Sequence, residues 1–218
     1  MKLLIEQIDM EEVSVLTETV EGKKFTYITG PYIRAEVVNG NRRKYPLSVV
    51  EPAVDNYKKE FVNESRALGE LGHPEGPKIN LERSSHLIVS LERSGNDYIG
   101  KSRIMNTPYG KIAQNMIEAG VKLGVSSRGV GSLKEQNGVN IVQSDFQIRC
   151  AADIVHDPSA PNAFVQSVVE NAEWVYDPIN GWKALEKAED YKKYIKAEYK
   201  RIDEEKALSM FRNFLNSL

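Results

Sequence analysis

The sequence predicts an α+β fold with a mostly antiparallel sheet, flanking helices and a C-terminal amphipathic helical segment. Short apolar runs bounded by turn residues, such as His86–Leu91, are typical of buried strands. Asn137 and Gly138 lie between two strand-like stretches and predict a hairpin, because both turn residues must tolerate a positive φ. Two other stretches place apolar residues three or four positions apart, which is the spacing of an amphipathic helix.

The first part of the chain predicts two strands, a loop and a helix. Lys24–Val38 is rich in Thr, Tyr, Ile and Val around Gly30 and Pro31, which indicates two strands joined by a turn. Asn39–Tyr45 is a basic turn, and it is either an exposed polar loop or a contact for a substrate or partner. Ser48–Leu68 has the apolar spacing of a helix, which ends at the glycines and prolines that follow.

The middle of the chain predicts a strand pair and a second helix. The dipeptide Asn96–Asp97 indicates a turn after the first apolar run, and Tyr98–Met105 continues as a strand. Thr107 can cap a helix that begins at Pro108, because the N–H that proline lacks would have no partner in a first turn. The apolar stripe of this helix runs up to Gly124.

The last part predicts further strands and then a long helix. Val139–Val155 is dominated by apolar residues, and an alternation with a period of two places Asp145 and Asp153 on one face. From Trp182 to Leu218 a helical stripe runs through a strongly charged background, which predicts a long amphipathic helix or a helix pair. This segment could dock on the domain, pair with another subunit or bind a helical scaffold.

Size and composition limit the number of domains and the class of function. A chain of 218 residues fits one domain of about 150 residues plus appendages, and we expect boundaries at 1–20, 21–180 and 181–218. A net charge of −2 gives no global electrostatic attraction to nucleic acid or to a membrane surface. No stretch approaches the roughly 18 apolar residues of a membrane span. The single cysteine, Cys150, is expected to be a buried thiol because its neighbours are apolar.

Three places carry candidate catalytic side chains. His73 lies in a turn rich in glycine and proline, which can hold an imidazole at the surface of a cleft. Ser126 and Ser127 have glycines nearby on both sides, and a nucleophilic serine needs such an uncrowded position beside a histidine base. Asp145 is an acid that could orient the histidine. A structural histidine, a polar turn and a solvated strand face explain the same residues, so the local sequence leaves both interpretations open.

Five segments, taken in order, resemble the prohead core proteases of tailed bacteriophages. The resemblance runs from about residue 25 to about residue 170, and the ordered combination is specific although no single motif decides it. The segment Val125–Ser127 is also similar to the Leu-Ser-Leu-Ser-Ser motif of the herpesvirus capsid maturation proteases, which are related in fold. The resemblance thus implies an antiparallel barrel core of the herpesvirus-protease type. The five segments are Gly69–Pro74, Ser85–Ile88, Gly124–Ser132, Asp145–Phe146 and Asp153–Pro161.

The resemblance implies a serine endopeptidase that works by acyl transfer, with His73 as general base. Ser126 is favoured over Ser127 as nucleophile, because the related motifs place the nucleophile directly after an aliphatic residue. Counting back from Gly129 selects Ser127 instead. No cofactor or metal is implied.

The third catalytic residue and the oxyanion hole are less narrowly defined by the resemblance. Asp145 is the first choice for the third residue, because the hairpin brings it roughly opposite the residues just after the serines. Asp153 and His86 are the alternatives, and the herpesvirus enzymes use a histidine there. Backbone N–H groups near Arg128 and Gly129 would form the oxyanion hole.

The family typically cleaves after glutamate in Leu/Ile-x-Glu, and this chain contains Leu4–Glu6 near its amino terminus. The resemblance therefore predicts self-cleavage after Glu6 as an activation step, in a segment expected to lie ahead of the folded part. Other tripeptides match the motif, and the requirement for mobile chain favours Glu6 and then Glu18 or Glu204.

The resemblance also implies partners and a location. The expected substrates are scaffold or core proteins and the major capsid protein, inside the prohead in the host cytoplasm. A homo-oligomer is expected, without nucleic-acid or membrane partners. One alternative is a non-catalytic capsid-core protein that keeps the fold and assembles with scaffold through its charged C-terminal helix. Another is a β-rich binding module whose serine and histidine never meet.

Overall fold

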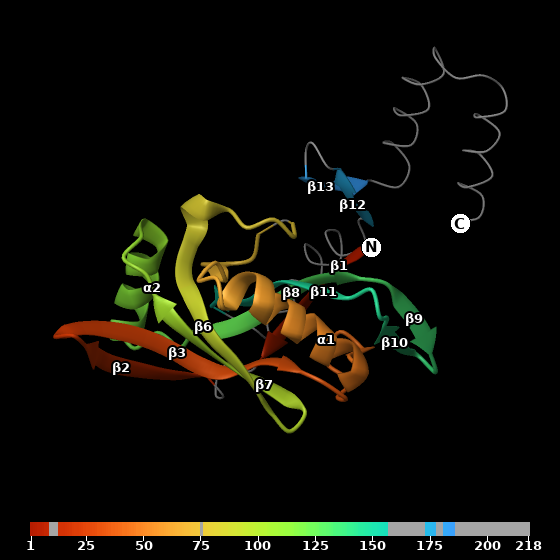
Figure 1. The fold of residues 1–218 in the computed structure, drawn as a ribbon, viewed down its shortest axis with the longest axis horizontal. Helices are drawn as coiled ribbons and strands as arrows, with labels where there is room; N and C mark the ends of the chain where they lie inside the picture. Colours follow the sequence, from red (N-terminus) through yellow and green to blue (C-terminus); the bar gives the residue numbers. More distant parts are fainter. Residues whose placement is uncertain (9–12, 75, 157–172, 178–180, 186–218) are drawn as a thin grey trace, which may run out of the picture.

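The computed structural model describes residues 1–8, 13–74, 76–156, 173–177 and 181–185 (Figure 1). Within these residues the strands form three sheets, almost entirely antiparallel, and two α-helices pack against them. This confirms the predicted α+β fold. No helix among the described residues is long and apolar enough to cross a membrane.

One five-stranded sheet contains both candidate serines. Its order is β11-β8-β1-β12-β13, and each neighbouring pair is antiparallel. Figure 1 shows β1, β8 and β11 lying side by side near the centre of the molecule. Its strands are β1 (Lys2–Ile8), β8 (Gly124–Gly131), β11 (Gln147–Val155), β12 (Glu173–Asp177) and β13 (Gly181–Leu185).

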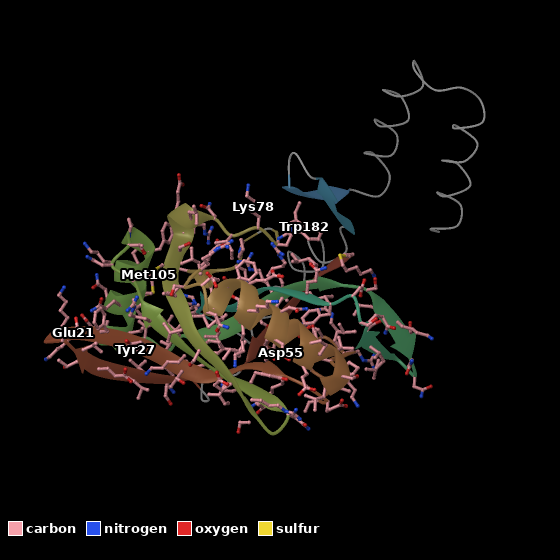
Figure 2. All side chains as sticks on the ribbon, viewed as in Figure 1. Glu21, Tyr27, Asp55, Lys78, Met105 and Trp182 are labelled. Carbon is pink, nitrogen blue, oxygen red and sulfur yellow. The ribbon has the colours of Figure 1, made fainter. Side chains whose placement is uncertain are left out.

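The second five-stranded sheet has the order β2-β3-β7-β6-β5 and is also antiparallel. Glu21 and Tyr27, labelled in Figure 2, lie in its first hairpin. The predicted break at Gly30 and Pro31 is wrong, because one strand runs through it and a register shift follows Pro31. The strands are β2 (Ser14–Val20), β3 (Lys23–Arg34), β5 (Leu68–Glu70), β6 (Ser84–Ser94) and β7 (Asp97–Ile104).

A small third sheet contains the predicted hairpin. Asn137 and Gly138 have φ values of +52° and +76°, so the Asn-Gly turn is confirmed. The sheet has the order β4-β10-β9, and β4 pairs with β10 in parallel. The strands are β4 (Arg43–Lys44), β9 (Leu133–Gln136) and β10 (Val139–Val142).

The helices follow the predicted spacing but are shorter than expected. Helix α1 (Leu47–Tyr57) continues into a π-helical turn, Lys58–Val62, so the helix predicted up to Leu68 ends earlier. Helix α2 (Pro108–Glu118) begins as predicted, with the Thr107 hydroxyl accepting a hydrogen bond from the Gly110 N–H at 3.1 Å. A short 3₁₀ turn, Leu81–Arg83, precedes β6.

The main core lies between the two large sheets and α1. Helix α1 buries Val50, Val54 and Tyr57, and the Tyr57 hydroxyl accepts a hydrogen bond from the backbone N–H of Ala151 in β11. Cys150 is fully buried in this core as predicted, and burial raises the pKa of its thiol well above the ordinary value. A thiol held protonated in this way is a poor nucleophile.

The amino-terminal segment is part of the fold, contrary to our expectation that it lies ahead of the folded part. Leu3 and Ile5 of β1 form a buried cluster with Val130 of β8. Trp182, labelled in Figure 2, packs against this cluster from β13. The long helix predicted for the carboxy-terminal region falls mainly on 186–218, which lies outside the described residues.

Candidate active site

Strand β8 presents the two serines on opposite faces of its sheet. Its pairing with β1 is continuous from Gly131 to Val125, so its side chains alternate regularly. Ser126 therefore shares one face with Arg128, and Ser127 points to the other. Ser126 is fully buried, whereas Ser127 is partly exposed.

The hydroxyl of Ser126 lies against a peptide carbonyl of β1. Its Oγ donates a hydrogen bond of 2.7 Å to the backbone oxygen of Glu6. In the register of the two strands, Glu6 is opposite Ser127 and Gln7 is opposite Ser126. A serine hydroxyl thus lies next to the peptide bond that joins Glu6 to Gln7.

A buried carboxylate lies across the sheet from Ser126. Asp153 of β11 is the register partner of Ser126, so both side chains project from the same face. The Asp153 carboxylate accepts hydrogen bonds from Arg128, at 2.5 Å to Nε and 3.2 Å to Nη2. It also accepts one from the backbone N–H of Glu70 at 3.0 Å, and the three side chains are fully buried.

A tight turn holds His73 beside this carboxylate. Gly72 has a φ of +80° and donates its N–H to the carbonyl of Ile154 at 2.8 Å, which fixes the turn against β11. The Nδ1 atom of His73 lies 4.0 Å from Oδ2 of Asp153, and the imidazole is 19% exposed. Among the described residues, neither ring nitrogen of His73 has a hydrogen-bond partner. Both nitrogen atoms are also buried, so the site contains an imidazole with two unpaired ring nitrogens.

Burial lowers the pKa of His73 from its ordinary value near 6.5. Asp153 offsets part of this decrease, and the Arg128 guanidinium adds to it. A histidine with a lowered pKa is neutral at pH 7, which is the form that can accept a proton from a serine.

His86 makes its hydrogen bonds within the core. Its Nδ1 and Nε2 atoms lie 2.9 Å from the Ser85 hydroxyl and from the Ala152 carbonyl, respectively. Burial lowers its pKa to about 4, and a Cβ atom at Gly69 would lie 2.1 Å from the ring. Both nitrogens are thus engaged within the core, as expected for a hydrogen-bonded core histidine.

Asp145 binds Ser132, which is not part of the turn that contains His73. Its carboxylate accepts hydrogen bonds from Ser132, at 2.9 Å to the backbone N–H and 2.6 Å to the hydroxyl. The predicted alternation from Asp145 to Asp153 is wrong, because β11 begins at Gln147 and contains two register shifts. The side chain that contacts His73 is that of Asp153, which was one of the two alternatives.

Two buried charges at the site were not predicted as functional. The Arg128 guanidinium joins Asp153 to Glu70, with 3.1 Å between its Nη2 atom and Oε1 of Glu70. It also donates to the carbonyl of Gly76 at 2.6 Å, which ties the His73 turn region to β8. An arginine among small and apolar strand residues was the available indication, since a buried charge needs a partner.

The basic turn Asn39–Tyr45 is less exposed than one of its two interpretations implied. Arg43 and Tyr45 are 7% and 4% exposed, and both contact the carboxylate of Glu6. The exposed-loop interpretation is therefore wrong for these two residues.

The site holds the groups needed for acyl transfer without a metal-binding cluster. Within the described ranges, no group of three His, Cys, Asp or Glu side chains could hold a metal ion. The Ser126 hydroxyl, the His73 imidazole and the Asp153 carboxylate are the residue types of a serine hydrolase triad, and the histidine lies beside the carboxylate.

Comparisons with known proteins found similarity to phage proteases. A model of the prohead core protein serine protease family matches residues 4–173. The prohead core protein protease of Enterobacteria phage T4 is 42% identical over 143 residues, which are 64% of this chain and 67% of that protein. The solved structure of the bacteriophage T4 capsid assembly protease has a TM-score of 0.65 and 35% sequence identity, covering 71% of this chain and 97% of that one.

Proposed function

The chain belongs to the prohead core protein serine protease family and is a phage prohead protease, and we propose that it acts as a serine endopeptidase with Ser126 as nucleophile. Its substrates as a capsid assembly protease are core and capsid proteins inside the prohead. We further propose that it cleaves them after glutamate in Leu/Ile-x-Glu sequences and that it first cleaves its own chain after Glu6.

The observation that carries the proposal is the contact between Ser126 and Glu6. The Ser126 hydroxyl lies 2.7 Å from the carbonyl oxygen of a Leu/Ile-x-Glu sequence, Leu4–Glu6, in its own chain. The atom that a serine nucleophile attacks is the carbonyl carbon bonded to this oxygen, and a reactive conformation places the two reacting atoms about 3–3.5 Å apart.

The catalytic roles follow from the charges around Ser126. His73 removes the proton of Ser126 as Oγ bonds to the carbonyl carbon of Glu6, and a tetrahedral oxyanion forms. The C–N bond to Gln7 then breaks, and His73 gives its proton to the departing amine. Water activated by His73 then hydrolyses the ester on Ser126. This step releases residues 1–6 with a new backbone α-carboxylate on Glu6. Asp153 stabilises the protonated imidazole, which we favour over Asp145 because of the 4.0 Å contact.

Self-cleavage also explains why the segment is a strand. Proteases bind their substrates in extended form, and pairing with β8 holds Lys2–Ile8 extended across the serine. Once the bond after Glu6 is cut, residues 1–6 can leave, and the edge of β8 becomes available to a substrate strand. The first six residues are thus the first substrate and an obstacle to the others.

The test is the intact mass of the purified full chain after incubation, beside His73→Ala, Ser126→Ala and Ser127→Ala. We expect the wild type and Ser127→Ala to lose the first six residues, and His73→Ala and Ser126→Ala to keep them. If the wild type stays whole and also fails to cut Leu-x-Glu peptides, the non-catalytic capsid-core protein becomes the better explanation.

A further inference from the structure

The turn after β3 binds the carboxylate of Glu6 through both oxygens. Oε1 accepts hydrogen bonds from Nη1 of Arg43 at 3.0 Å and from the Tyr45 hydroxyl at 2.7 Å. Oε2 accepts hydrogen bonds from the amide nitrogens of Asn39 and Asn41, the latter at 3.3 Å. All four groups donate, so they match a carboxylate, which only accepts.

The same turn binds the backbone of the preceding residue. The Ile5 carbonyl accepts hydrogen bonds from Nδ2 of Asn41 at 3.1 Å and from Nη1 of Arg43 at 3.3 Å. Ile5 is the central residue of Leu/Ile-x-Glu, the position at which that motif accepts any side chain. A contact with its backbone leaves this position free to vary.

Hydrogen bonds within the turn hold these donors in place. Oδ1 of Asn39 accepts from the backbone N–H groups of Asn41 and Arg43, at 3.1 Å and 2.9 Å. The backbone N–H of Asn39 donates to the carbonyl of Arg43 at 2.9 Å, which closes the turn. The Asn39 amide is thereby oriented with its nitrogen toward Glu6. A binding group that is already ordered loses little entropy when its ligand arrives.

Aromatic packing fixes the turn relative to the nucleophile strand. The Tyr45 ring makes an edge-to-face contact with Phe146, with 5.2 Å between ring centroids. Phe146 in turn fills the space over Gly129 of β8, where an added Cβ atom would lie 2.3 Å from its ring. Since Gly129 is three residues after Ser126, the carboxylate-binding turn and the nucleophile are held by one packed unit.

We infer that Asn39, Asn41, Arg43 and Tyr45 form the pocket that selects glutamate at the cleaved bond, both in the amino-terminal strand and in substrates that replace it. This inference rests on the proposed function. Its basis is that one residue, Glu6, has its side chain in the pocket and its carbonyl at the Ser126 hydroxyl.

The chemistry of the pocket predicts its selectivity. Glutamine would turn an NH2 group toward at least one donor, which leaves a buried polar pair unsatisfied. Aspartate would hold its carboxylate about 1.5 Å farther from the donors, because it lacks one C–C bond. The side chains of Glu6 and Arg43 are only 15% and 8% exposed, so water does little to weaken their ion pair.

A double-mutant cycle of self-cleavage tests the pocket in the full chain. The four proteins are the wild type, Glu6→Gln, Arg43→Gln and the double variant, and the rate is the loss of residues 1–6 by intact mass. We expect Glu6→Gln to slow the wild type about 100-fold, because a buried charge pair is broken. In the Arg43→Gln background, Glu6→Gln should slow self-cleavage by less than about threefold, because the ion pair is already lost.

Arg42 provides the matched control. It is the adjacent arginine, its side chain is exposed, and Arg42→Gln removes the same charge without touching Glu6. In the Arg42→Gln background, Glu6→Gln should again slow cleavage about 100-fold. Tyr45→Phe keeps the ring contact with Phe146 and deletes one donor, so it replaces Arg43→Gln if that variant does not fold.

Each result has a distinct meaning. Equal effects of Glu6→Gln in the wild-type and Arg43→Gln backgrounds overturn the pocket and leave the protease intact. The pocket is also overturned if the effect of Glu6→Gln on the self-cleavage rate shrinks in the Arg42→Gln background and not in the Arg43→Gln background. A wild-type chain that neither loses its first six residues nor cuts a Leu-Ile-Glu peptide overturns the proposed function, and the pocket with it.

Discussion

Replacing Asp153 by asparagine separates the two acids that compete for the third catalytic position. Asp153 is fully buried, accepts two hydrogen bonds from Arg128 and one from the Glu70 backbone, and lies 4.0 Å from His73. Asp153→Asn leaves the guanidinium of Arg128 partly uncompensated, and breaking a buried ion pair costs about 3–5 kcal/mol of unfolding free energy. Loss of the charge beside the imidazole should also slow self-cleavage at least about 100-fold, since Asp→Asn in a triad costs up to about 10⁴-fold.

The matching change at Asp145 should have little effect on catalysis. Its hydrogen bonds go to Ser132, so we expect Asp145→Asn to change the self-cleavage rate by less than about threefold and the unfolding free energy by about 1 kcal/mol. Glu70→Gln is the control for structural damage, because Glu70 binds the same face of Arg128 but forms no ion pair with His73 in the described part of the chain. It should lower stability with a rate loss of less than about tenfold.

Two measurements apply to each variant. Urea unfolding is done in a Ser126→Ala background, so that all chains keep their amino terminus, and the self-cleavage rate is measured by intact mass well below the unfolding transition. The reasoning is refuted if Asp145→Asn stops cleavage while Asp153→Asn lowers only stability. It is also refuted if Glu70→Gln and Asp153→Asn slow cleavage equally, since Asp153 would then act only through the fold.

Two further predictions concern pH. As the pH is raised, the self-cleavage rate should increase through a single midpoint below pH 6.5 and then stay level. The reason is that burial lowers the pKa of His73, whose neutral form is the base. A midpoint above pH 7 would contradict this. His86 should make the fold less stable in acid: the unfolded chain takes up a proton near pH 6.5, whereas folded His86 does so only near pH 4. Between these values stability should fall by about 3 kcal/mol, in addition to any contribution from His73. Urea unfolding at a series of pH values should show a shallower decrease for His86→Gln, and an unchanged slope would contradict the assignment.

The parts of the fold that the sequence predicted are those fixed by local physics. The helix start at Thr107 and Pro108 and the Asn137–Gly138 turn depend on backbone preferences of the residues themselves, and both are confirmed. The strand through Gly30 and Pro31 was missed because a bulge in the sheet accommodates the proline, and that bulge depends on pairing with β7. Which strands pair is set by contacts between distant segments, and local patterns do not contain that information.

In the candidate site too, local sequence patterns predicted some residues, and contacts between distant segments decided the others. His73, Ser126 and Ser127 were proposed from expected turn positions together with the family resemblance, and the structure places the two serines within strand β8. The choice between Asp145 and Asp153 needed the register of β11 against β8, since two register shifts break the alternation that had placed both acids on one face. The buried position of Arg128 followed from the same register, and no local pattern indicated that its side chain would bind Asp153.

The proposed cleavage after Glu6 is compatible with the burial of the amino-terminal strand. Mobility was expected to decide which Leu/Ile-x-Glu sequences are cut, and Leu4–Glu6 is instead held in a sheet with Leu4 only 1% exposed. What a protease requires is an extended segment with its carbonyl at the nucleophile, and pairing with β8 supplies both. An intramolecular strand also has a high effective concentration at the site, so it competes with any substrate supplied from outside. The proposed cleavage after Glu6 would remove this advantage, because the released residues would then bind only as a separate short peptide. The proposed self-cleavage would therefore precede the cleavage of other chains, because the strand already occupies the site.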